Sequence, residues 1–452
     1  MIVRLKTWWS PRVPNRRVLA SWAYLSVTSI GGALTVAAAA RLLPAADAGM
    51  WFTLQSLTSF TPLAEMGTQV SGARQFAHSF AAQAGADGEW ISAPGMIQTR
   101  AGLAGVSDTM AALRYLRRFM YPLFVSLAVA LGAIVYYSAA KAEVSTGIAL
   151  LAWVFLSLAA MAQMEGYRYQ SALDGVGRID LERGTAAIAY ALASIGVFFA
   201  MLLVGSITLM ATVWAIGMVA ALFAYRFALA RWVGRLPRPE IDRRAGARGL
   251  LRVSSRIWLL NLGAIATRSA QVPAVSMLVG AASVPGYFLS FKMLNIVALV
   301  VAAVPQAERS LFTQDLAAGR KKEARTRMLR ALIPQVVGAA ATIIAFSLAG
   351  HWFITLWLRN PRAINYSTVY VMAFDTAISM VPGAVGQFVL ASGRNPFVVS
   401  TLAAGIATVG LLFALVPHYG VLGAALAPLL AGLLTNYWYS LYQGFVLLRT
   451  LD

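Results

Sequence analysis

Long apolar stretches, interrupted at short intervals by charged residues, glycine or proline, follow one another along nearly the whole chain. About 20 residues of helix cross the hydrocarbon core of a bilayer, and twelve stretches reach roughly this length. The pattern therefore predicts an all-α integral membrane protein with about twelve transmembrane helices. The predicted spans cover residues 18–40, 49–72, 119–140, 147–171, 184–204, 206–228, 254–279, 285–309, 331–357, 366–392, 397–417 and 420–447.

The composition agrees with a lipid environment. Hydrophobic residues make up 59% of the chain and charged residues 12%, against about a quarter charged in soluble domains. A chain this poor in charge cannot cover a water-facing surface, so lipid must surround much of it. The net charge of +20 would indicate nucleic acid in a soluble protein. Here topology accounts for the charge, and we expect no nucleic-acid partner.

The basic residues alternate from one connection to the next. With the N-terminus inside, 31 Lys and Arg residues fall on the cytoplasmic side, and only Arg41, Lys141, Arg359 and Arg362 fall outside. Because cytoplasmic connections of membrane proteins collect basic residues, both termini are predicted to be cytoplasmic. The basic N-terminal segment precedes an apolar stretch without a convincing cleavage site, so this stretch is interpreted as a retained first span.

The chain offers little for catalysis or metal binding. It has no cysteine, and His78, His351 and His418 lie far apart without ligand spacing. The predicted external connections are all short, which argues against a membrane enzyme with a large external catalytic loop. We therefore expect no enzyme activity, no metal and no cofactor. The longest connection, residues 73–118, is cytoplasmic, and residues 111–118 within it fit either a surface amphipathic helix or a solvated loop.

Two weak sequence echoes indicate an internal duplication. Residues 44–52 resemble residues 280–288, and residues 172–178 resemble residues 389–394, each with one gap. With six helices in each half, the halves run the same way across the membrane and are related by a pseudo-two-fold axis along the membrane normal. Chance similarity between segments rich in glycine and alanine is the alternative. The predicted units are an N-terminal lobe of residues 1–230, a basic cytoplasmic linker of residues 231–253 and a C-terminal lobe of residues 254–452.

Two cations lie deep inside predicted spans. Arg268 is near the middle of the seventh span and Lys292 lies in the eighth. A charge facing lipid costs about 2.5–3.5 kcal/mol or more, so these side chains must face protein or a water-filled cavity. A guanidinium and an ammonium in a partly dehydrated cavity form a site for a phosphate or pyrophosphate. The alternative is a structural ion pair with an acid on a neighbouring helix.

Three acids lie well inside predicted spans, Glu65, Glu165 and Asp375, and Glu308 lies near the inner end of the eighth span. Asp375 is the deepest and is expected either to pair with one of the two cations or to bind a coupling proton or sodium ion. Glu65 and Glu165 lie towards the cytoplasmic ends of their helices, where Arg74 and Arg168 are close in sequence. For these two, a structural role is favoured.

Four neutral polar residues complete the candidate site. Gln55, Asn261, Asn295 and Gln387 lie inside predicted spans, where their side chains could bond sugar hydroxyls. Polar residues in such positions more often bridge neighbouring helices, so this alternative stays open.

Several short motifs, in a fixed order along the chain, carry a family resemblance. They include Leu63-Ala-Glu65-Met-Gly67 and Ala172-Leu-Asp-Gly-Val-Gly-Arg178, together with residues 40–49, 285–288, 303–306, 316–319 and 418–425. In these motifs and in its topology the chain resembles the polysaccharide-exporter branch of the multidrug/oligosaccharidyl-lipid/polysaccharide (MOP) flippase superfamily. Two departures are notable. Glu65 stands where the family often has Asp, and the two extra helices usual in lipid II flippases are missing.

The resemblance implies two lobes in a V, alternating access, and a polyprenyl-pyrophosphate-linked oligosaccharide as the substrate. It implies that cations in the cavity hold the phosphates, and Arg268 and Lys292 fit that role. It also implies a bacterial inner-membrane location and, as partners, polysaccharide polymerase or glycosyltransferase machinery. The alternatives are a cation-coupled multidrug exporter of the same fold, against which the two cations argue, a membrane enzyme and a non-transporting scaffold.

Overall fold

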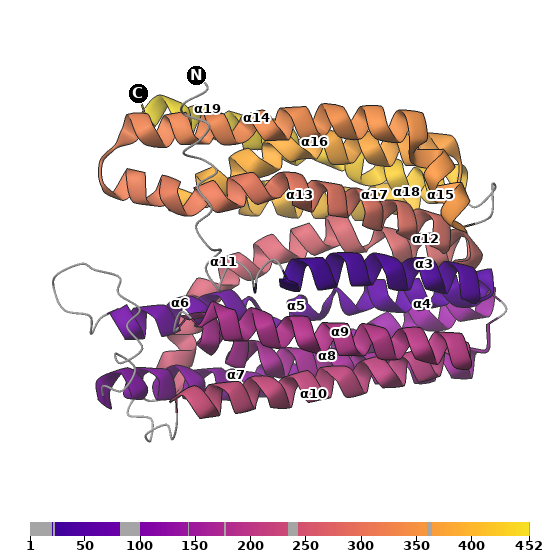
Figure 1. The fold of residues 1–452 in the computed structure, drawn as a ribbon, viewed down its shortest axis with the longest axis horizontal. Coiled ribbons are helices and arrows are strands. Elements are labelled where there is room, and N and C mark those ends of the chain that lie inside the picture. The colour runs from indigo at the N-terminus through magenta and orange to yellow at the C-terminus, as the bar shows by residue number, and fades with distance from the viewer. Residues whose placement is uncertain are drawn as a thin grey trace.

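The computed structural model describes residues 20, 23–81, 100–142, 144–175, 178–233, 243–358 and 364–451. Every regular element in this part of the chain is helical (Figure 1). Ten helices are long and apolar enough to cross a membrane. The second and seventh predicted spans, residues 49–72 and 254–279, are also helical, but each is broken into shorter helices. Together these account for the twelve predicted spans.

The N-terminal half holds the first six spans. Its elements are η1 (Val27–Gly31, a π-helix), α3 (Gly32–Leu42), α4 (Ala45–Thr58), α5 (Thr61–Glu65), α6 (Thr68–Ala81), α7 (Arg100–Lys141), α8 (Thr146–Gly175), α9 (Ile179–Leu203) and α10 (Ile207–Val233). The second span is the broken one, because Met66 and Gly67 between α5 and α6 both have a positive φ.

The C-terminal half holds the other six spans. Its elements are α11 (Arg243–Ser269), α12 (Gln271–Leu278), η3 (Ala281–Ser283), α13 (Val284–Ala317), α14 (Lys321–Ala345), η4 (Phe346–Gly350), α15 (His351–Leu358), α16 (Tyr366–Ala391), α17 (Val398–Tyr419), α18 (Val421–Ala431), η5 (Gly432–Asn436) and α19 (Tyr437–Leu451). The seventh span breaks between α11 and α12.

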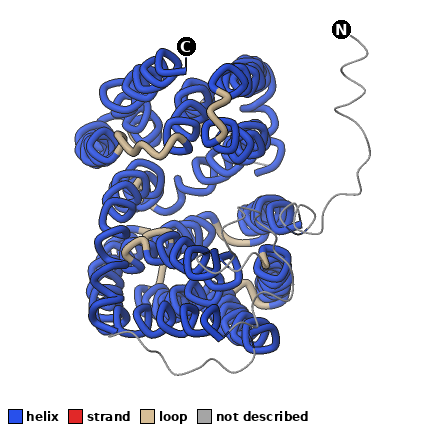
Figure 2. Tube along the Cα trace, turned by 90° about the vertical axis from the view of Figure 1, so that its left-hand side faces the viewer, coloured by secondary structure: helices blue, strands red, loops and turns tan. Residues whose placement is uncertain are grey.

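The two halves form two lobes of roughly parallel helices, as the colours of Figure 1 show. Figure 2, a view along the helices from the end where α14 begins, shows one lobe above the other. Many large apolar side chains point outward, among them Leu203 at 77% and Leu348 at 82% exposure. Such a surface suits lipid, which solvates apolar side chains that water would not. The chain is thus a multi-pass membrane protein.

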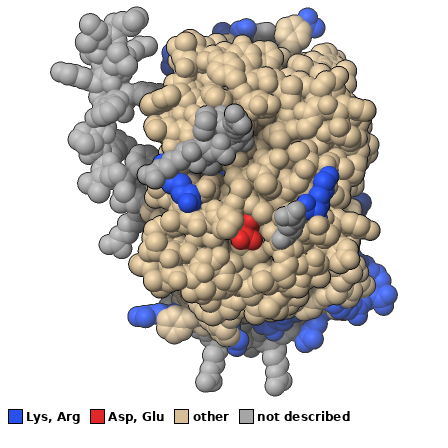
Figure 3. All heavy atoms as spheres, turned by 90° about the vertical axis from the view of Figure 1, so that its right-hand side faces the viewer, with Lys and Arg blue, Asp and Glu red and all other residues tan. Residues whose placement is uncertain are grey.

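The charged residues separate towards the two ends of the helices. The end of the molecule that lies on the right in Figure 1 presents few Lys, Arg, Asp or Glu side chains (Figure 3). The starts of α7, α11 and α14 and the ends of α8 and α10 carry the basic residues. By the positive-inside rule the basic end is cytoplasmic, and we call the other end the outer end.

One prediction about connections is wrong and another stays a prediction. Helix α11 begins at Arg243, so residues 243–253 of the predicted linker are helical; residues 234–242 lie outside the described part of the chain, and the division into two lobes and a linker stays a prediction. Residues 111–118 are neither a surface helix nor a solvated loop, because they continue into the third span as part of α7. Ala111, Ala112, Leu113 and Leu116 are buried there, and their apolar side chains extend the helix at little cost.

Helix α11 packs on both lobes and runs obliquely from one to the other (Figure 1). Near its cytoplasmic end, the Ser254 and Ser71 hydroxyl oxygens lie 2.5 Å apart, and the Trp258 indole donates to the Leu63 carbonyl. Further out, α11 meets α17 of its own lobe so closely that a Cβ on Gly263 would lie 2.2 Å from the Thr401 carbonyl oxygen. Helix α11 therefore belongs structurally to both lobes.

Candidate functional site

Residues 44–52 and residues 280–288, which resemble each other in sequence, meet at the outer end of the interface between the lobes. Their last residues, Phe52 of α4 and Phe288 of α13, stack with ring centroids 4.8 Å apart and an interplanar angle of 16°. A Cβ on Gly49 would lie 1.7 Å from the Ala281 carbonyl oxygen, so only glycine allows this approach. Equivalent residues of two halves contact each other only beside the axis that relates them. The stack therefore lies next to the pseudo-two-fold axis.

Further contacts close the outer end around this stack. The Arg41 Nε donates to the Trp357 carbonyl at 2.6 Å, joining α3 to α15. The Lys141 Nζ donates to the Leu278 carbonyl at 2.5 Å, joining α7 to α12. Each bond joins the N lobe to the C lobe at its outer end. The outer face is accordingly a continuous surface (Figure 3).

The two predicted anion-binding residues lie directly inside this closure. Lys292 follows Phe288 by one helical turn, and its Nζ lies 5.2 Å from the centre of that ring. On the other lobe, Ser56 follows Phe52 by one turn and donates to the carbonyl of Ser269, the residue after Arg268, at 3.2 Å. Arg268 and Lys292 therefore each lie about one helical turn inside the stack. Neither makes a salt bridge within the described part of the chain.

The Ser269 carbonyl accepts a bond from the other lobe because a proline has released it. Pro273 lies four residues later and has no N–H to donate back, so the helix breaks between α11 and α12. Two further carbonyls in the C lobe, each four residues before a proline, also accept hydrogen bonds from other helices. Pro305 frees the Val301 carbonyl, which accepts from Gln335 at 2.7 Å. Likewise, the Ala424 carbonyl released by Pro428 accepts from Tyr287 at 3.3 Å.

Asp375 lies on α16 and faces α19. It accepts a hydrogen bond of 2.6 Å from the Tyr437 hydroxyl, and Arg268 is near enough to interact with it electrostatically. The prediction left open whether Arg268 or Lys292 would be the neighbouring cation, and the structure places Arg268 there. Tyr437 could not be predicted as the partner of Asp375, because nothing in the local sequence pattern links α19 to α16.

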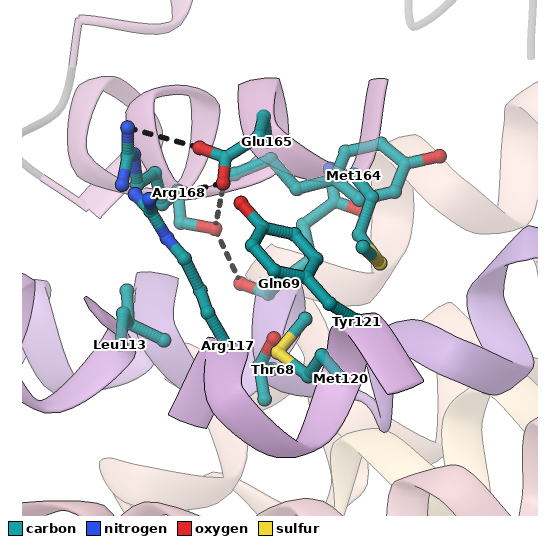
Figure 4. A pocket seen from close by; sticks show the side chains of 11 residues that line it. Thr68, Gln69, Leu113, Arg117, Met120, Tyr121, Met164, Glu165 and Arg168 are labelled. Carbon is teal, nitrogen blue, oxygen red and sulfur yellow. Dashed lines mark hydrogen bonds and ion pairs between the residues drawn. The ribbon is translucent and has the colours of Figure 1, made fainter. Parts of the chain in front are cut away.

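The other two acids lie in the N lobe, away from the two cations. Glu165 bonds Arg117 at 3.0 Å and Arg168 at 2.9 Å (Figure 4). The pocket around this cluster has a volume of about 20 Å³. That is room for a single water, so a phosphate or a sugar does not fit.

Glu65 has a different partner from the one its sequence neighbour indicated. It is 3% exposed, and its carboxylate accepts bonds from the Thr68 hydroxyl and the Gln69 backbone N–H. Both donors belong to the first turn of α6, whose N–H groups lack partners within the helix. Glu65 thus caps the helix that follows the Met66–Gly67 break. This is a structural role, as the sequence favoured, but the partner is the first turn of α6 rather than Arg74.

The four neutral polar residues are spread over both lobes. Gln55 is partly buried on α4, beside Ser56. Asn295 lies on α13, one turn from Lys292, and Asn261 on α11, and both are also partly buried. Gln387 lies on α16, and its buried Oε1 has no hydrogen-bond partner. Gln55 and Asn295 are thus close in sequence to the residues that flank the stack.

Comparison with known proteins finds similarity only at the level of structure. No sequence family and no curated protein matches the chain. It is similar to "Lipid II flippase MurJ, inward closed conformation" at a TM-score of 0.72 and 12% identity, covering 96% of this chain and 90% of that chain. It is also similar to an inward-facing multidrug resistance transporter of the MATE family in the MOP superfamily, at a TM-score of 0.67 and 13% identity, covering 95% and 99%.

An outward-facing MATE transporter aligns with a TM-score of 0.59 and 14% identity over 96% of both chains. The higher score for the inward-facing structure agrees with the closed outer end described above. Identities this low establish the fold alone. The chain therefore has the same overall fold as these transporter structures.

Proposed function

We propose that the protein is a flippase that moves a polyprenyl-pyrophosphate-linked oligosaccharide across the bacterial inner membrane by alternating access. The observation that carries the proposal is the position of Arg268 and Lys292. Both lie directly inside the outer closure, one in each of two helices at the lobe interface, and neither has a carboxylate in salt-bridge contact. A charge inside a membrane is costly without a partner. The two phosphates of the substrate would supply that partner.

The surroundings of Arg268 support a coupled cycle. Asp375 and its Tyr437 partner lie near Arg268 without a salt bridge to it among the described residues, so the carboxylate partly offsets the charge of the guanidinium when no substrate is bound. A pyrophosphate would compete with Asp375 for Arg268, and the displaced carboxylate would take up a proton or a sodium ion. Glu65 and Glu165 are already satisfied by α6 and by two arginines. We therefore assign ion coupling to Asp375.

The closed outer end supports loading from the cytoplasmic side. Phe52 and Phe288 stack between the two lobes at the outer end, so we expect the substrate to reach the cations from the membrane or from the basic end. Gln55 and Asn295 lie within one turn of the proposed pyrophosphate site and are the first candidates for the sugar hydroxyls; Asn261 and Gln387 are the next. One of the structural relatives is a lipid II flippase, which supports a lipid cargo for this chain.

The multidrug transporters among the structural relatives favour a second function, export of organic cations. Arg268 and Lys292 oppose it, because two positive charges without carboxylate salt bridges repel a cationic drug. A direct comparison of the two ligand classes separates these functions.

The test is equilibrium binding of an undecaprenyl-pyrophosphate oligosaccharide to the protein in nanodiscs. Arg268→Ala/Lys292→Ala is measured beside the wild type. Arg231→Ala/Arg330→Ala is the matched control, because it removes two exposed arginines from the cytoplasmic side. We expect the central variant to lose binding by at least tenfold and the control to keep it. Equal binding by all three proteins, or binding of organic cations only, contradicts the proposal.

A further inference from the structure

Helix α11 carries its arginines in an unusually regular register. Arg244, Arg248, Arg252 and Arg256 are spaced four residues apart, and Arg268 falls in the same series after two uncharged positions. Residues four apart form a ridge on a helix, and each step advances about 6 Å along the axis. All five arginines are exposed. Because each step of four residues also turns about 40° around the axis, the ridge winds around α11. Arg268 lies about a third of a turn from Arg256 and nearly opposite Arg252.

The cytoplasmic part of the ridge lies on the face of α11 that is turned away from the N lobe. The opposite face packs on α6 and α7 through Ala247, Leu250 and Ser254, which are 2%, 5% and 0% exposed. Arg248 and Arg252 lie between these positions and remain uncovered. The arginines are therefore accessible along a helix that lies between the two lobes.

Topology alone does not account for this register. The positive-inside rule requires basic residues on the cytoplasmic side but sets no spacing between them. Like charges four residues apart on a helix repel each other and destabilise it. Arg248, Arg252 and Arg256 have no salt bridge among the described residues to relieve this repulsion. A register that costs stability is explained by a polyanionic ligand that contacts neighbouring arginines together.

We propose that Arg248, Arg252 and Arg256 form a loading site that collects the diphosphate head group of a lipid substrate before it reaches Arg268 and Lys292. The proposal rests on the flippase function and adds the residues that capture the cargo. Successive steps of about 6 Å let two phosphates contact two arginines at once. Arg256 lies about 18 Å from Arg268 along the helix. The loading site is therefore separate from the central site, and it acts on the rate of capture.

The test measures association of a fluorescent polyprenyl diphosphate with the protein in nanodiscs by stopped flow, at low and high salt. The variant is Arg252→Gln/Arg256→Gln, and the matched control is Arg231→Gln/Arg330→Gln, which removes the same charge from exposed cytoplasmic positions off the ridge. Steering by a basic surface raises association rates about 10-fold to 1,000-fold and weakens with salt. We expect at least a tenfold slower association at low salt and a flatter salt dependence in the ridge variant only.

Affinity distinguishes the two sites. A loading site changes association and dissociation by the same factor, so the ridge variant keeps the equilibrium affinity of the wild type. The Arg268→Ala/Lys292→Ala variant instead keeps fast, salt-dependent association and loses affinity. Arg252→Lys/Arg256→Lys should restore the rate, which excludes misfolding. A ridge variant with the rate and salt dependence of its control overturns the loading site and leaves the flippase function intact; no association with the wild type overturns both.

Discussion

Phe52 and Phe288, one from each half of the chain, stack face to face across the interface between the lobes, with ring centroids 4.8 Å apart. They end the two sequence segments that echo each other, so the stack is a contact between equivalent parts of a duplicated fold. It also separates the outer end from the two cations one turn further in. The outer closure and the proposed binding site are thus built on the same two helices.

Removal of one ring should weaken the outer closure. Aromatic pairs contribute about 0.5–1.5 kcal/mol beyond the area they bury, so Phe288→Ala should shift the balance towards an open outer end by up to about tenfold. The chain has no cysteine, so labels on Val204→Cys and Tyr419→Cys, exposed near the outer ends of the two lobes, report their separation. We expect a longer distance to become populated in the variant.

Phe199→Ala is the control for this measurement. Phe199 also contacts another aromatic ring, that of Phe198, but it is 52% exposed on the outside of the N lobe. Its loss should leave the distance distribution unchanged. An unchanged distribution in Phe288→Ala as well would show that the stack does not hold the outer end closed.

Close packing of α11 against α17 gives a second prediction. A Cβ on Gly263 would lie 2.2 Å from the Thr401 carbonyl oxygen, so Gly263→Ala must push the two helices apart. Overpacking of this kind costs about 1–3 kcal/mol and should lower the thermal unfolding midpoint in detergent. Gly249→Ala on the same helix meets no atom within 4 Å and should be neutral or slightly stabilising. Equal midpoints for the two variants would contradict the close approach.

The hydrogen bond from Ser56 to Ser269 should depend on Pro273. In the wild type, Ser56→Ala removes a bond between the lobes that is worth about 1 kcal/mol. Pro273→Ala restores the N–H that would bond the Ser269 carbonyl within the helix, so the carbonyl no longer needs Ser56. A double-mutant cycle measured by chemical unfolding tests this coupling. Ser56→Ala should lower the free energy of unfolding clearly when Pro273 is present and only slightly in the Pro273→Ala background. Strict additivity of the two changes would refute this coupling.

The turn between α13 and α14 should be sensitive to acid. Asp315 accepts bonds from Arg320 at 2.7 Å and Arg327 at 2.9 Å, and these bonds hold its pKa below the ordinary range. A carboxylate with a lowered pKa stabilises the fold above its unfolded pKa of about 3.9 and loses this contribution as the pH falls through the folded value. Asp315→Asn should thus unfold at a lower temperature than the wild type at pH 7. The difference should begin to shrink below about pH 3.9 and vanish only below the folded pKa of Asp315.

Glu323→Gln is the control for this prediction, because Glu323 is exposed in the first turn of α14 and makes no salt bridge with the described residues. Its unfolding midpoint should follow the wild type at every pH. A difference between Asp315→Asn and the wild type that persists in acid would mean that the side chain acts through packing rather than through its charge.

Hydrophobic runs and basic loops were enough to predict the twelve spans and the all-α membrane fold. The sequence echo also placed the two segments that now meet at Phe52 and Phe288. The pattern did not predict the start of α11, because residues 243–253 are rich in arginine and read as a loop. Their helix is stabilised by packing of Ala247 and Leu250 on the N lobe, a contact that no local pattern reveals.

The sequence was enough to predict single charged residues of the candidate site but not the residues that contact them. Charges inside apolar spans identify Arg268, Lys292 and Asp375, because such positions are costly. Their partners are not visible in the sequence. Tyr437 bonds Asp375 from 62 residues away, and Ser56 bonds a carbonyl 213 residues away. Such contacts depend on how the helices rotate and pack, which hydropathy does not encode.

The position of α11 also bears on how the protein is made. The six spans of the N-terminal half have been synthesised once the ribosome passes Val233, but the surface around Gly67 and Ser71 is then still bare, because Ser254 and Ile257 of α11 cover it. Membrane insertion of the first half therefore comes before its packing is complete. Assembly does not proceed lobe by lobe, and a chain that stops after α10 leaves the surface around Gly67 and Ser71 uncovered, where chaperones or proteases can recognise it.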